Sequence, residues 1–469
     1  MWNLDGYHKN IAVITENNEK ISYQTLQNET ETLAGFIQKR CLIFCFCKNT
    51  IGSLIGYTTF LNHNIVPLLL DSQLDKQFID DLVVKYHPAY LWIPESMKNN
   101  FKEYKMVYCS CEYMLLRTEY DFGYELNDML ALLLPTSGST GSPKLVRLSY
   151  ANVQANMEDI AEYMEIDENE RAITTLPMNY TYGLSIINSH LCKGATIIMT
   201  EKSLLQKEFW QQFRDFEATS FGGVPYTYEM LNKLKFYQMD LPFLKTITQA
   251  GGKLSPELHK KFAEYAIAND KKFVVMYGQT EATARMSYLP CEKSLEKYGS
   301  MGIAIPNGRF ALQDSNGESI SSANVEGELV YYGKNVTLGY AECGEDLKKN
   351  DERQGMLLTG DIAKFDEDGY YYIVGRKKRF LKIFGKRINL DETEHILKQH
   401  FDCMDIACSG KDDKMYIFLT NSTMLSVVKK FIVEKTGLNA VAFKVKKIEG
   451  IPKNDAGKII YADLVKYYD

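Results

Sequence analysis

The feature that most constrains the fold is a regular alternation of short apolar runs with longer amphipathic stretches. A helix-like stretch from Ile21 to about Lys39 is followed by apolar runs at 42–46 and 65–69 and by helix-like stretches at 50–62 and 74–86. The alternation returns later, with strands expected near 195–200, 217–222, 245–249 and 272–277 and helices near 204–214, 225–235 and 256–268. Such alternation is typical of β-α-β units with parallel strands. The sequence therefore predicts an α/β fold in which helices cover parallel sheets.

The pattern changes after about residue 300. Residues 300–375 are rich in glycine and alternate apolar with polar side chains, which predicts a β-rich subdomain. Within this subdomain, Asp366–Gly369 separates two strand-like runs and is expected to form a hairpin turn. A basic junction follows at 375–379, and the remainder is predicted to form a small α+β domain. We place the boundary at Lys378, which divides the chain into domains at 1–377 and 378–469.

The composition excludes several classes of protein. The chain has 469 residues, of which 45% are hydrophobic and 24% charged, unlike a disordered chain or a membrane bundle. Acidic residues outnumber basic ones by 60 to 54, so we expect a small molecule rather than nucleic acid as the main partner. Neither a secretory signal nor a membrane-spanning run is visible. The ten cysteines lack a zinc-binding spacing, so we expect them to be reduced, in a cytoplasmic protein with no membrane partner.

The sharpest motif follows the apolar run Met129–Leu134. Hydroxyl side chains, glycines and a lysine are concentrated there, at Thr136, Ser137, Gly138, Ser139, Thr140, Gly141 and Lys144. Glycines let the backbone approach a phosphate closely, N–H groups and hydroxyls donate to its oxygens, and the lysine adds positive charge. The spacing differs from the Walker pattern, and a flexible linker rarely begins directly after a buried strand. The motif therefore predicts a phosphate-binding loop.

A second motif ends the strand-like run Val274–Met276 with Tyr277, Gly278, Gln279, Thr280 and Glu281. Ligands of parallel α/β sheets bind at the carboxyl ends of strands, where this turn would lie. The Tyr277 ring is suited to stack on a base, and the Glu281 carboxylate is suited to hold Mg²⁺. Because a plain turn contains the same residue types, this motif gains its weight from the others.

Two further motifs lie nearer the C-terminus. Asp361 is followed fourteen residues later by Gly375 and then Arg376. A carboxylate can accept hydrogen bonds from both hydroxyls of a ribose, and a nearby arginine can add a charged hydrogen bond. Lys458 follows Gly457 on a predicted turn near the end of the chain. Taken alone, each of these features is better explained by a surface turn or a solvated side chain.

Together, these four motifs resemble those of the adenylate-forming superfamily of acyl-CoA synthetases, peptide-synthetase adenylation domains and luciferases. The resemblance extends from Ile21 to Lys458 and depends on the order and spacing of the motifs. It implies a large N-terminal domain and a small mobile C-terminal domain with ATP held between them. The implied cofactors are ATP and Mg²⁺, with CoA or the phosphopantetheine of a carrier protein as the thiol acceptor.

The resemblance also implies roles for individual residues. Lys458 would bridge the acid and the α-phosphate, Thr280 would contact that phosphate, and Glu281 would be the Mg²⁺ ligand. The nucleotide would further be bound by the phosphate loop, namely Thr136, Ser137, Gly138, Ser139, Thr140, Gly141 and Lys144, and by Gly251, Gly252, Tyr277, Gly278, Gln279, Asp361 and Arg376. Lys378 would be the hinge between the domains, and Gly385 would line the thiol tunnel.

By the same resemblance, the candidates for the lining of the acid pocket are Asn179, Tyr180, Tyr182, Val224, Ala250, Gly251, Gly252 and Met276. This mixture of polar and aromatic groups favours a small or medium acid over a long fatty chain. The chain departs from the family pattern at Leu145, at Tyr150 and at the pair Asn179–Tyr180, which replaces a frequent Phe-His. Members that activate amino acids have an aspartate for the substrate ammonium in the stretch that corresponds to 180–185. This stretch has no acidic residue here, which lowers the weight of an amino acid substrate.

The sequence therefore predicts an AMP-forming acid–thiol ligase, which converts a carboxylic acid to an acyl-adenylate and then transfers the acyl group to a thiol. Two alternatives remain open. One is a standalone adenylation module that loads an amino acid onto a carrier protein and ignores free CoA. The other is a degenerate nucleotide-binding or scaffold protein, against which the presence of Glu281, Asp361 and Lys458 counts.

Overall fold

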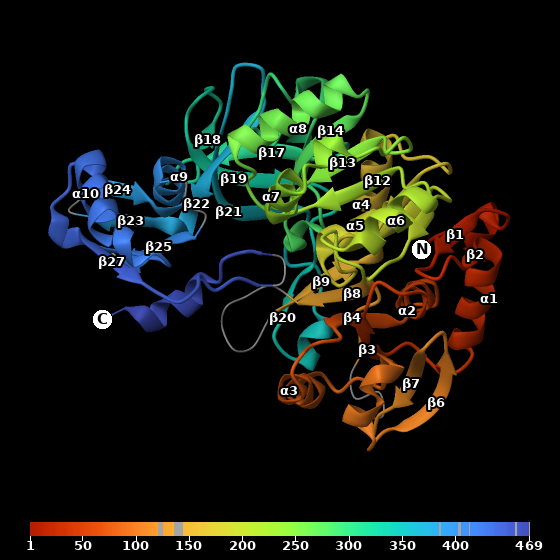
Figure 1. Cartoon of the computed structure of the whole chain (residues 1–469). Coiled ribbons are helices and arrows are strands. Elements are labelled where there is room, and N and C mark those ends of the chain that lie inside the picture. The colour runs from red at the N-terminus through yellow and green to blue at the C-terminus, as the bar shows by residue number, and fades with distance from the viewer. Residues whose placement is uncertain are drawn as a thin grey trace. The chain divides into compact units, whose positions relative to one another are not determined.

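The structure is a computed structural model that describes residues 1–120, 125–135, 144–383, 386–401, 405–411, 413–454 and 457–468 (Figure 1). At 378, 380, 382, 386 and 387 it describes the backbone alone. Contacts divide the described residues into two compact units. The first unit takes in those within 1–135, 144–309 and 331–357, and the second takes in those within 310–330 and 358–468.

One sheet of the first unit is built around the parallel strands β8, β4, β3 and β5. Its order is β20 (Gly339–Ala341), β9 (Leu145–Ser149), β8 (Leu130–Pro135), β4 (Val66–Asp71), β3 (Leu42–Cys47), β5 (Tyr90–Pro94), β7 (Tyr113–Arg117) and β6 (Lys105–Ser110). Side chains alternate between the two faces of a strand, so Ile43 and Cys45 enter one core while Leu42 and Phe44 enter another. The first core receives α1 (Tyr23–Ala34) and α2 (Ile51–Asn62), and the second receives α3 (Lys76–Tyr86).

The other sheet of the first unit has parallel strands from β14 to β1, with antiparallel strands added at both edges. Its order is β16 (Ile303–Ala304), β15 (Ser287–Leu289), β14 (Lys272–Tyr277), β13 (Thr246–Gln249), β12 (Ser220–Gly223), β10 (Arg171–Ile173), β11 (Thr196–Ile198), β1 (Ile11–Ile14) and β2 (Lys20–Ser22). Helices α4 (Tyr150–Tyr163) and α5 (Thr181–Cys192) contribute Val153 and Leu184 to the core that also holds Ile43 and Ile197. One apolar core is therefore shared by both sheets.

Aromatic contacts connect further helices to this second sheet. Phe213 of α6 (Lys207–Asp215) lies edge-on to Phe221 of β12, with 6.0 Å between ring centroids. Tyr228 of α7 (Pro225–Lys233) lies 5.6 Å from Phe273 of β14, and Phe262 of α8 (Pro256–Ala268) contacts both of these rings. Large aromatic side chains bury much apolar area each, so this packing stabilises the positions of β12 and β14.

The second unit contains smaller sheets. A five-stranded sheet, whose strands β19 and β21 extend into the first unit, has the order β18 (Ser319–Ile320), β17 (Arg309–Gln313), β19 (Gly327–Tyr332), β21 (Met356–Phe365) and β22 (Tyr371–Arg376). The remaining strands are β23 (Phe380–Ile383), paired with β24 (Lys386–Asn389), and the sheet of β25 (Ile406–Lys411), β26 (Lys414–Leu419) and β27 (Phe443–Lys447). Leu397 of α9 (Leu390–Phe401) and Val428 of α10 (Leu425–Thr436) pack with Ile417 in one core.

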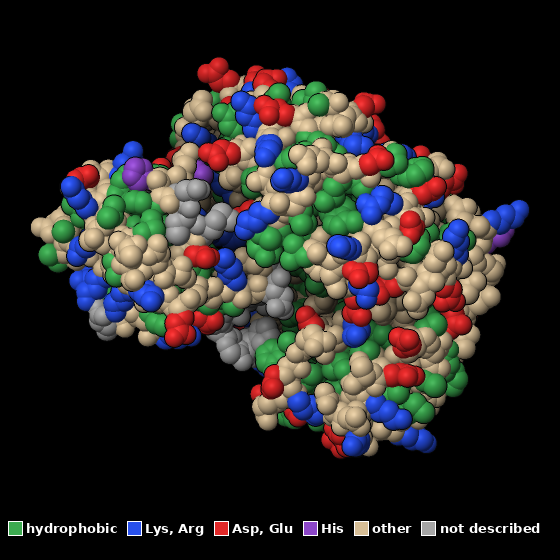
Figure 2. Space-filling model, viewed as in Figure 1, with side chains coloured by type: hydrophobic (Ala, Val, Ile, Leu, Met, Phe, Trp, Pro, Cys, Tyr) green, Lys and Arg blue, Asp and Glu red, His purple; other side chains and the backbone are tan. Residues whose placement is uncertain are grey.

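Short 3₁₀ helices complete the described elements. They are η1 (Leu4–Tyr7), η2 (Glu95–Phe101), η3 (Phe236–Gln238), η4 (Thr280–Ala282), η5 (Cys291–Lys293), η6 (Gly344–Lys348), η7 (Lys377–Arg379), η8 (Ser422–Met424), η9 (Ala440–Ala442) and η10 (Tyr461–Tyr467). No helix among the described residues has the length and apolar character needed to span a bilayer. Figure 2 shows acidic and basic side chains interspersed over the face in view.

The predicted α/β fold with a β-rich subdomain is confirmed, and Asp366–Gly369 forms the expected turn between β21 and β22. Two expectations need correction. The sheets are mixed rather than parallel throughout, because antiparallel strands such as β9 and β15 extend their edges. Helix α1 ends at Ala34 instead of near Lys39, because the poor helix former Gly35 follows and the chain turns through Ile37. The domain boundary at Lys378 stays a prediction.

Candidate active site

Three neighbouring parallel strands, β12, β13 and β14, end at the same edge of the second sheet (Figure 1). In register, Gly223 is paired with Gln249, and Gln249 is paired with Val275. The residues that follow on the three strands are therefore neighbours, namely Val224, Ala250 and Met276. Because ligands of open α/β sheets bind at the carboxyl ends of parallel strands, this edge is the candidate site.

The structure brings together the apolar members of the predicted acid pocket. Tyr182, Val224, Ala250 and Met276 are buried in one cluster, and Tyr180 packs against them. Burial raises the pKa of the Tyr180 hydroxyl to about 12. The Tyr182 hydroxyl lies 2.7 Å from the Thr248 hydroxyl of β13.

The glycines of the predicted pocket lie against the same cluster. Gly251 has a φ of +82°, and a Cβ atom there would come within 2.6 Å of the Tyr180 hydroxyl. A Cβ on Gly252 would meet Pro225 at 3.0 Å, and Asn179 is half-buried in the turn before α5. A cavity of about 10 Å³ lies among α4, α5, β8 and β9, with Thr181 and Thr283 in its lining, and holds no more than about one water molecule.

The signature turn after β14 depends on a close backbone approach. A Cβ atom on Gly278 would lie 1.7 Å from the carbonyl oxygen of Ala284, so only glycine fits there. Thr283 adopts a φ of +64°, which reverses the chain and brings Ala284 back toward β14. Gln279 donates a hydrogen bond to the Tyr277 hydroxyl at 3.0 Å. Contacts among its own residues therefore help to fix the turn.

Two side chains of the turn were predicted to act on phosphate and metal. The Thr280 hydroxyl lies 2.9 Å from the hydroxyl of Thr181, at the start of α5. The Glu281 carboxylate accepts a hydrogen bond of 2.7 Å from the Tyr340 hydroxyl, and Arg353 donates to the Glu281 carbonyl oxygen at 2.9 Å. Burial, followed by the nearby Glu281 charge, raises the pKa of Tyr340 to about 12. Tyr340 is thus a steady donor to this carboxylate.

The residues around Glu281 suit a metal that arrives with a nucleotide. Among the described residues, no group of three or more His, Cys, Asp or Glu side chains could hold an ion by itself. Mg²⁺ is usually bound through one or two carboxylates together with substrate phosphates. A single carboxylate, held in place by the Tyr340 hydroxyl, fits that donor set.

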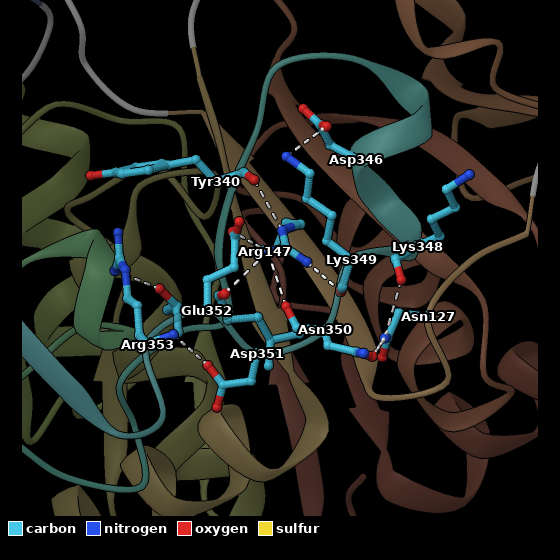
Figure 3. Close-up of polar contacts among 12 residues, drawn as sticks. Asn127, Arg147, Tyr340, Asp346, Lys348, Lys349, Asn350, Asp351, Glu352 and Arg353 are labelled. Atoms are coloured by element: carbon cyan, nitrogen blue, oxygen red, sulfur yellow. Dashed lines mark hydrogen bonds and ion pairs between the residues drawn. The ribbon is translucent and has the colours of Figure 1, made fainter.

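Tyr340 also connects the predicted phosphate loop to a charged network. Figure 3 shows Tyr340 and Arg353 close to Arg147 and Glu352, and the Arg353 guanidinium lies 4.7 Å from the Tyr340 ring centroid. Lys144 forms an ion pair of 2.5 Å with Glu342 and lies 5.8 Å from the same ring centroid. The other members of the predicted loop, Thr136, Ser137, Gly138, Ser139, Thr140 and Gly141, lie outside the described residues.

The second unit contains the remaining predicted site residues. Asp361 and Arg376 are paired in register on β21 and β22, and Arg376 Nε lies 2.7 Å from Asp361 Oδ1. Asp361 is buried, and its amide donates to the Thr359 hydroxyl. Lys458 follows Gly457 on a turn in which the Asn454 amide donates to the Lys458 carbonyl oxygen and the Lys458 amide donates to the Asn454 side-chain oxygen.

The Lys378 side chain and Gly385 lie outside the described residues. Their roles as hinge and tunnel residues remain predictions from the resemblance.

The sequence did not single out three residues that contact the site. Tyr340 and Arg353 lie far along the chain from Glu281, and no local pattern indicates that they reach it. Arg285, however, follows the signature turn by only four residues and is almost completely buried. A charged residue placed directly behind a predicted binding motif was the signal that could have identified Arg285.

A sheet with glycine-rich turns at the carboxyl ends of its parallel strands is typical of nucleotide-binding α/β enzymes. Residues 2–341 match the model of the AMP-binding enzyme family, so the chain belongs to that family. The predicted membership of the adenylate-forming superfamily is thereby confirmed.

Individual relatives agree with this assignment. The chain is 27% identical over 452 residues to a probable CoA ligase of Humulus lupulus and 29% identical over 343 residues to the oxalate–CoA ligase of Arabidopsis thaliana. These alignments cover 90% and 70% of the chain, and 81% and 66% of the two relatives. The chain thus spans less than two thirds of the oxalate ligase and of several further relatives.

The fold also matches solved structures. The o-succinylbenzoate CoA synthetase of Bacillus subtilis, in complex with its acyl-adenylate intermediate, superposes with a TM-score of 0.80 at 20% identity. This match covers 98% of the chain and 97% of the synthetase. ATP-bound MatB of Rhodopseudomonas palustris gives a TM-score of 0.79 at 20% identity, over 99% and 96% of the two chains. Both matches support the same fold.

Replacement of Gly278 by alanine should destabilise the turn at the carboxyl end of β14. The added methyl group would clash with the Ala284 carbonyl, which belongs to backbone and cannot rotate away. We expect Gly278→Ala to lower the free energy of unfolding by about 3 kcal/mol, the upper end of the usual overpacking cost. Urea denaturation followed by circular dichroism measures this change.

Gly450→Ala is the matched control, because nothing lies within 4 Å of a Cβ atom at that position. Its free energy of unfolding should stay within about 0.5 kcal/mol of wild type, as for most surface substitutions. Equal stability of the two variants would contradict the close approach at Gly278.

Proposed function

We propose that this protein is an AMP-forming acid–thiol ligase, which activates a small or medium carboxylic acid with ATP and passes the acyl group to a thiol. One observation carries the proposal. Glu281, held by the Tyr340 hydroxyl, and the apolar cluster around Tyr182 lie at the ends of neighbouring strands, which supports adjacent sites for a metal-bound phosphate and an acid. The CoA ligases among the relatives support the same reaction class.

The proposed reaction has two steps. An oxygen of the substrate carboxylate attacks the α-phosphorus of ATP, pyrophosphate leaves, and a mixed anhydride of acid and AMP forms. A thiolate then attacks the acyl carbon, the thioester forms, and AMP leaves. The first step brings two anions together, so positive charge and hydrogen-bond donors must stabilise the developing charge. Mg²⁺, when bound, supplies part of that charge.

Residues of the first unit have proposed parts in these steps. Thr280 would donate to the α-phosphate, and Glu281, held by Tyr340, would ligate Mg²⁺. Tyr277, Gly251 and Gly252 would bind the adenine. The apolar cluster that contains Tyr182, Val224, Ala250 and Met276 would hold the body of the acid and exclude water from it.

Residues of the second unit also have proposed parts. Asp361, whose carboxylate is already oriented by Arg376, would bind the ribose hydroxyls. Lys458 would neutralise charge between the acid and the α-phosphate, and a hinge at Lys378 would let the thiol approach near Gly385. We further propose CoA as the acceptor, with a carrier-protein phosphopantetheine as the alternative. Exclusive loading of a carrier protein with an amino acid would instead favour the standalone adenylation module.

Acid-dependent exchange of labelled pyrophosphate into ATP tests the proposal. The enzyme should catalyse exchange with at least one acid from a panel of short mono- and dicarboxylic, hydroxylated and aromatic acids, and only in the presence of Mg²⁺. ATP binding without exchange for every acid of the panel would favour the degenerate nucleotide-binding alternative and contradict the ligase.

Substitution of Lys458 should separate the two half-reactions. Lys458→Ala is expected to slow pyrophosphate exchange by about 10²–10³, because it removes a charged group that acts on the adenylation transition state. Thioester formation from preformed acyl-adenylate should stay within about threefold of wild type. Lys453→Ala, on the same turn, is the control and should leave both reactions unchanged. An equal loss in both half-reactions for Lys458→Ala would contradict its assigned role.

Removal of the Tyr340 hydroxyl should weaken the proposed metal site. Tyr340→Phe keeps the ring beside Arg353 but takes away the hydrogen bond to Glu281. Groups that orient a metal ligand are typically worth about 10–100-fold in metal affinity, so the Mg²⁺ concentration for half-maximal exchange should rise by about that factor. Tyr332→Phe, whose ring lies over Arg309, is the control. An unchanged Mg²⁺ dependence in Tyr340→Phe would argue against Glu281 as the ligand.

A further inference from the structure

Arg285 is a buried arginine that the proposed reaction does not use. Only 4% of the residue's surface is exposed. Its position is fixed by its backbone, because the Arg285 carbonyl oxygen accepts hydrogen bonds from Asn156 at 2.9 Å and from Asn335 at 3.0 Å. The backbone of Arg285 is thus held at a defined place next to β14.

The guanidinium contacts the apolar cluster around Tyr182 and the neighbouring helices α4 and α5. Its Nε donates to the Ser185 hydroxyl at 3.1 Å. Its Nη1 lies 3.2 Å from the Tyr163 hydroxyl and 3.2 Å from the Met276 sulfur, and its centre lies 5.3 Å from the Tyr182 ring centroid. All of these partners are uncharged. Among the described residues, Nη2 donates no hydrogen bond.

Two other arginines with little exposed side chain have carboxylate partners. Arg147, completely buried, lies 2.6 Å from a Glu352 carboxylate oxygen and donates to several backbone carbonyls (Figure 3). Arg379 forms ion pairs of 2.8 Å with Asp391 and 2.6 Å with Glu394. Within the part of the chain that the structure describes, Arg285 takes part in no such ion pair.

A guanidinium keeps its positive charge even when it is buried, since its pKa is too high for it to lose a proton. A buried charge without an opposite charge is unfavourable, and neutral partners compensate for it only in part. Arg285 is such a charge, and it lies beside Met276 and Tyr182 of the apolar cluster. A ligand that brings a negative charge would complete the environment of the guanidinium.

We propose that the acid substrate is a dicarboxylic acid and that Arg285 binds the carboxylate that does not react. This inference rests on the proposed function and specifies its substrate class. The reacting carboxylate would lie toward Thr280, and the acid would extend past Met276 and Tyr182 to the guanidinium. A carboxylate matches the planar donor geometry of arginine and forms charge-assisted hydrogen bonds with it. A substrate ammonium at this position would be repelled, which also disfavours an amino acid with a cationic side chain.

The competing explanation is a structural role, in which Arg285 connects Tyr163 of α4 and Ser185 of α5 to β14. The two roles predict different results when the second carboxylate is removed from the substrate. A structural arginine affects all acids alike. An arginine that binds the second carboxylate affects diacids alone and does so mainly through KM.

Pyrophosphate exchange with matched pairs of acids tests the inference. The pairs combine succinate with butyrate, glutarate with pentanoate and adipate with hexanoate, so that each pair has the same chain length. In at least one pair, the wild-type kcat/KM for the diacid should exceed that for the monoacid by tenfold or more. Arg285→Met, which keeps a long side chain without the charge, should raise KM for that diacid at least tenfold and leave the monoacid within threefold.

Two further variants complete the test. Arg285→Lys should recover part of the preference for the diacid, because it restores the positive charge. Arg171→Met, on a partly exposed arginine that pairs with Glu217, is the control and should change neither class of acid. Thermal melting of each variant checks that it is folded.

The inference and the proposed function fail in distinguishable ways. Exchange with monoacids at an efficiency equal to or above that with the matched diacids would overturn the inference and leave the ligase intact. A similar loss for both acids of a pair in folded Arg285→Met would also overturn it, in favour of a structural role. Absence of exchange with every acid would contradict the ligase and the inference together.

Discussion

The close approach of the chain to the end of β14 is the constraint on which the candidate site depends. Gly278 has no side chain, Thr283 reverses the backbone, and Met286 donates to the Tyr277 carbonyl at 2.8 Å, so the segment returns directly along its own strand. This return places Glu281 within reach of Tyr340 and places Arg285 beside Met276. One backbone reversal therefore positions both charged groups of the site.

The two charged groups are held in a similar way. The Glu281 carboxylate accepts from the Tyr340 hydroxyl, and the Arg285 guanidinium donates to the Ser185 hydroxyl. Neutral partners orient a charge without cancelling it, whereas an ion pair such as that of Arg147 with Glu352 neutralises the charge internally. In our account, the negative charge is kept for a metal and the positive charge for an anion of the substrate.

Local patterns in the sequence predicted most of the elements but not how they pair. The apolar periodicity gave α8 at 256–268 and β14 at 272–277, because both patterns depend on neighbouring residues alone. The pairing of β20 with β9 joins residues far apart in the chain and could not be predicted locally. The same holds for the site: the turn at Tyr277–Glu281 was visible, whereas Tyr340 and the neutral surroundings of Arg285 depend on tertiary packing.

The central claim is that the carboxyl edge of β12, β13 and β14 binds an acyl-adenylate. A crystal structure of the protein with a non-hydrolysable acyl-sulfamoyl adenosine tests this claim most directly. The account predicts that the adenine lies against Gly251, Gly252 and Tyr277, that the sulfamoyl group lies at Thr280, and that the acyl chain enters the cluster around Tyr182. Density for the compound at another place on the protein, or none at saturating concentration, would contradict it.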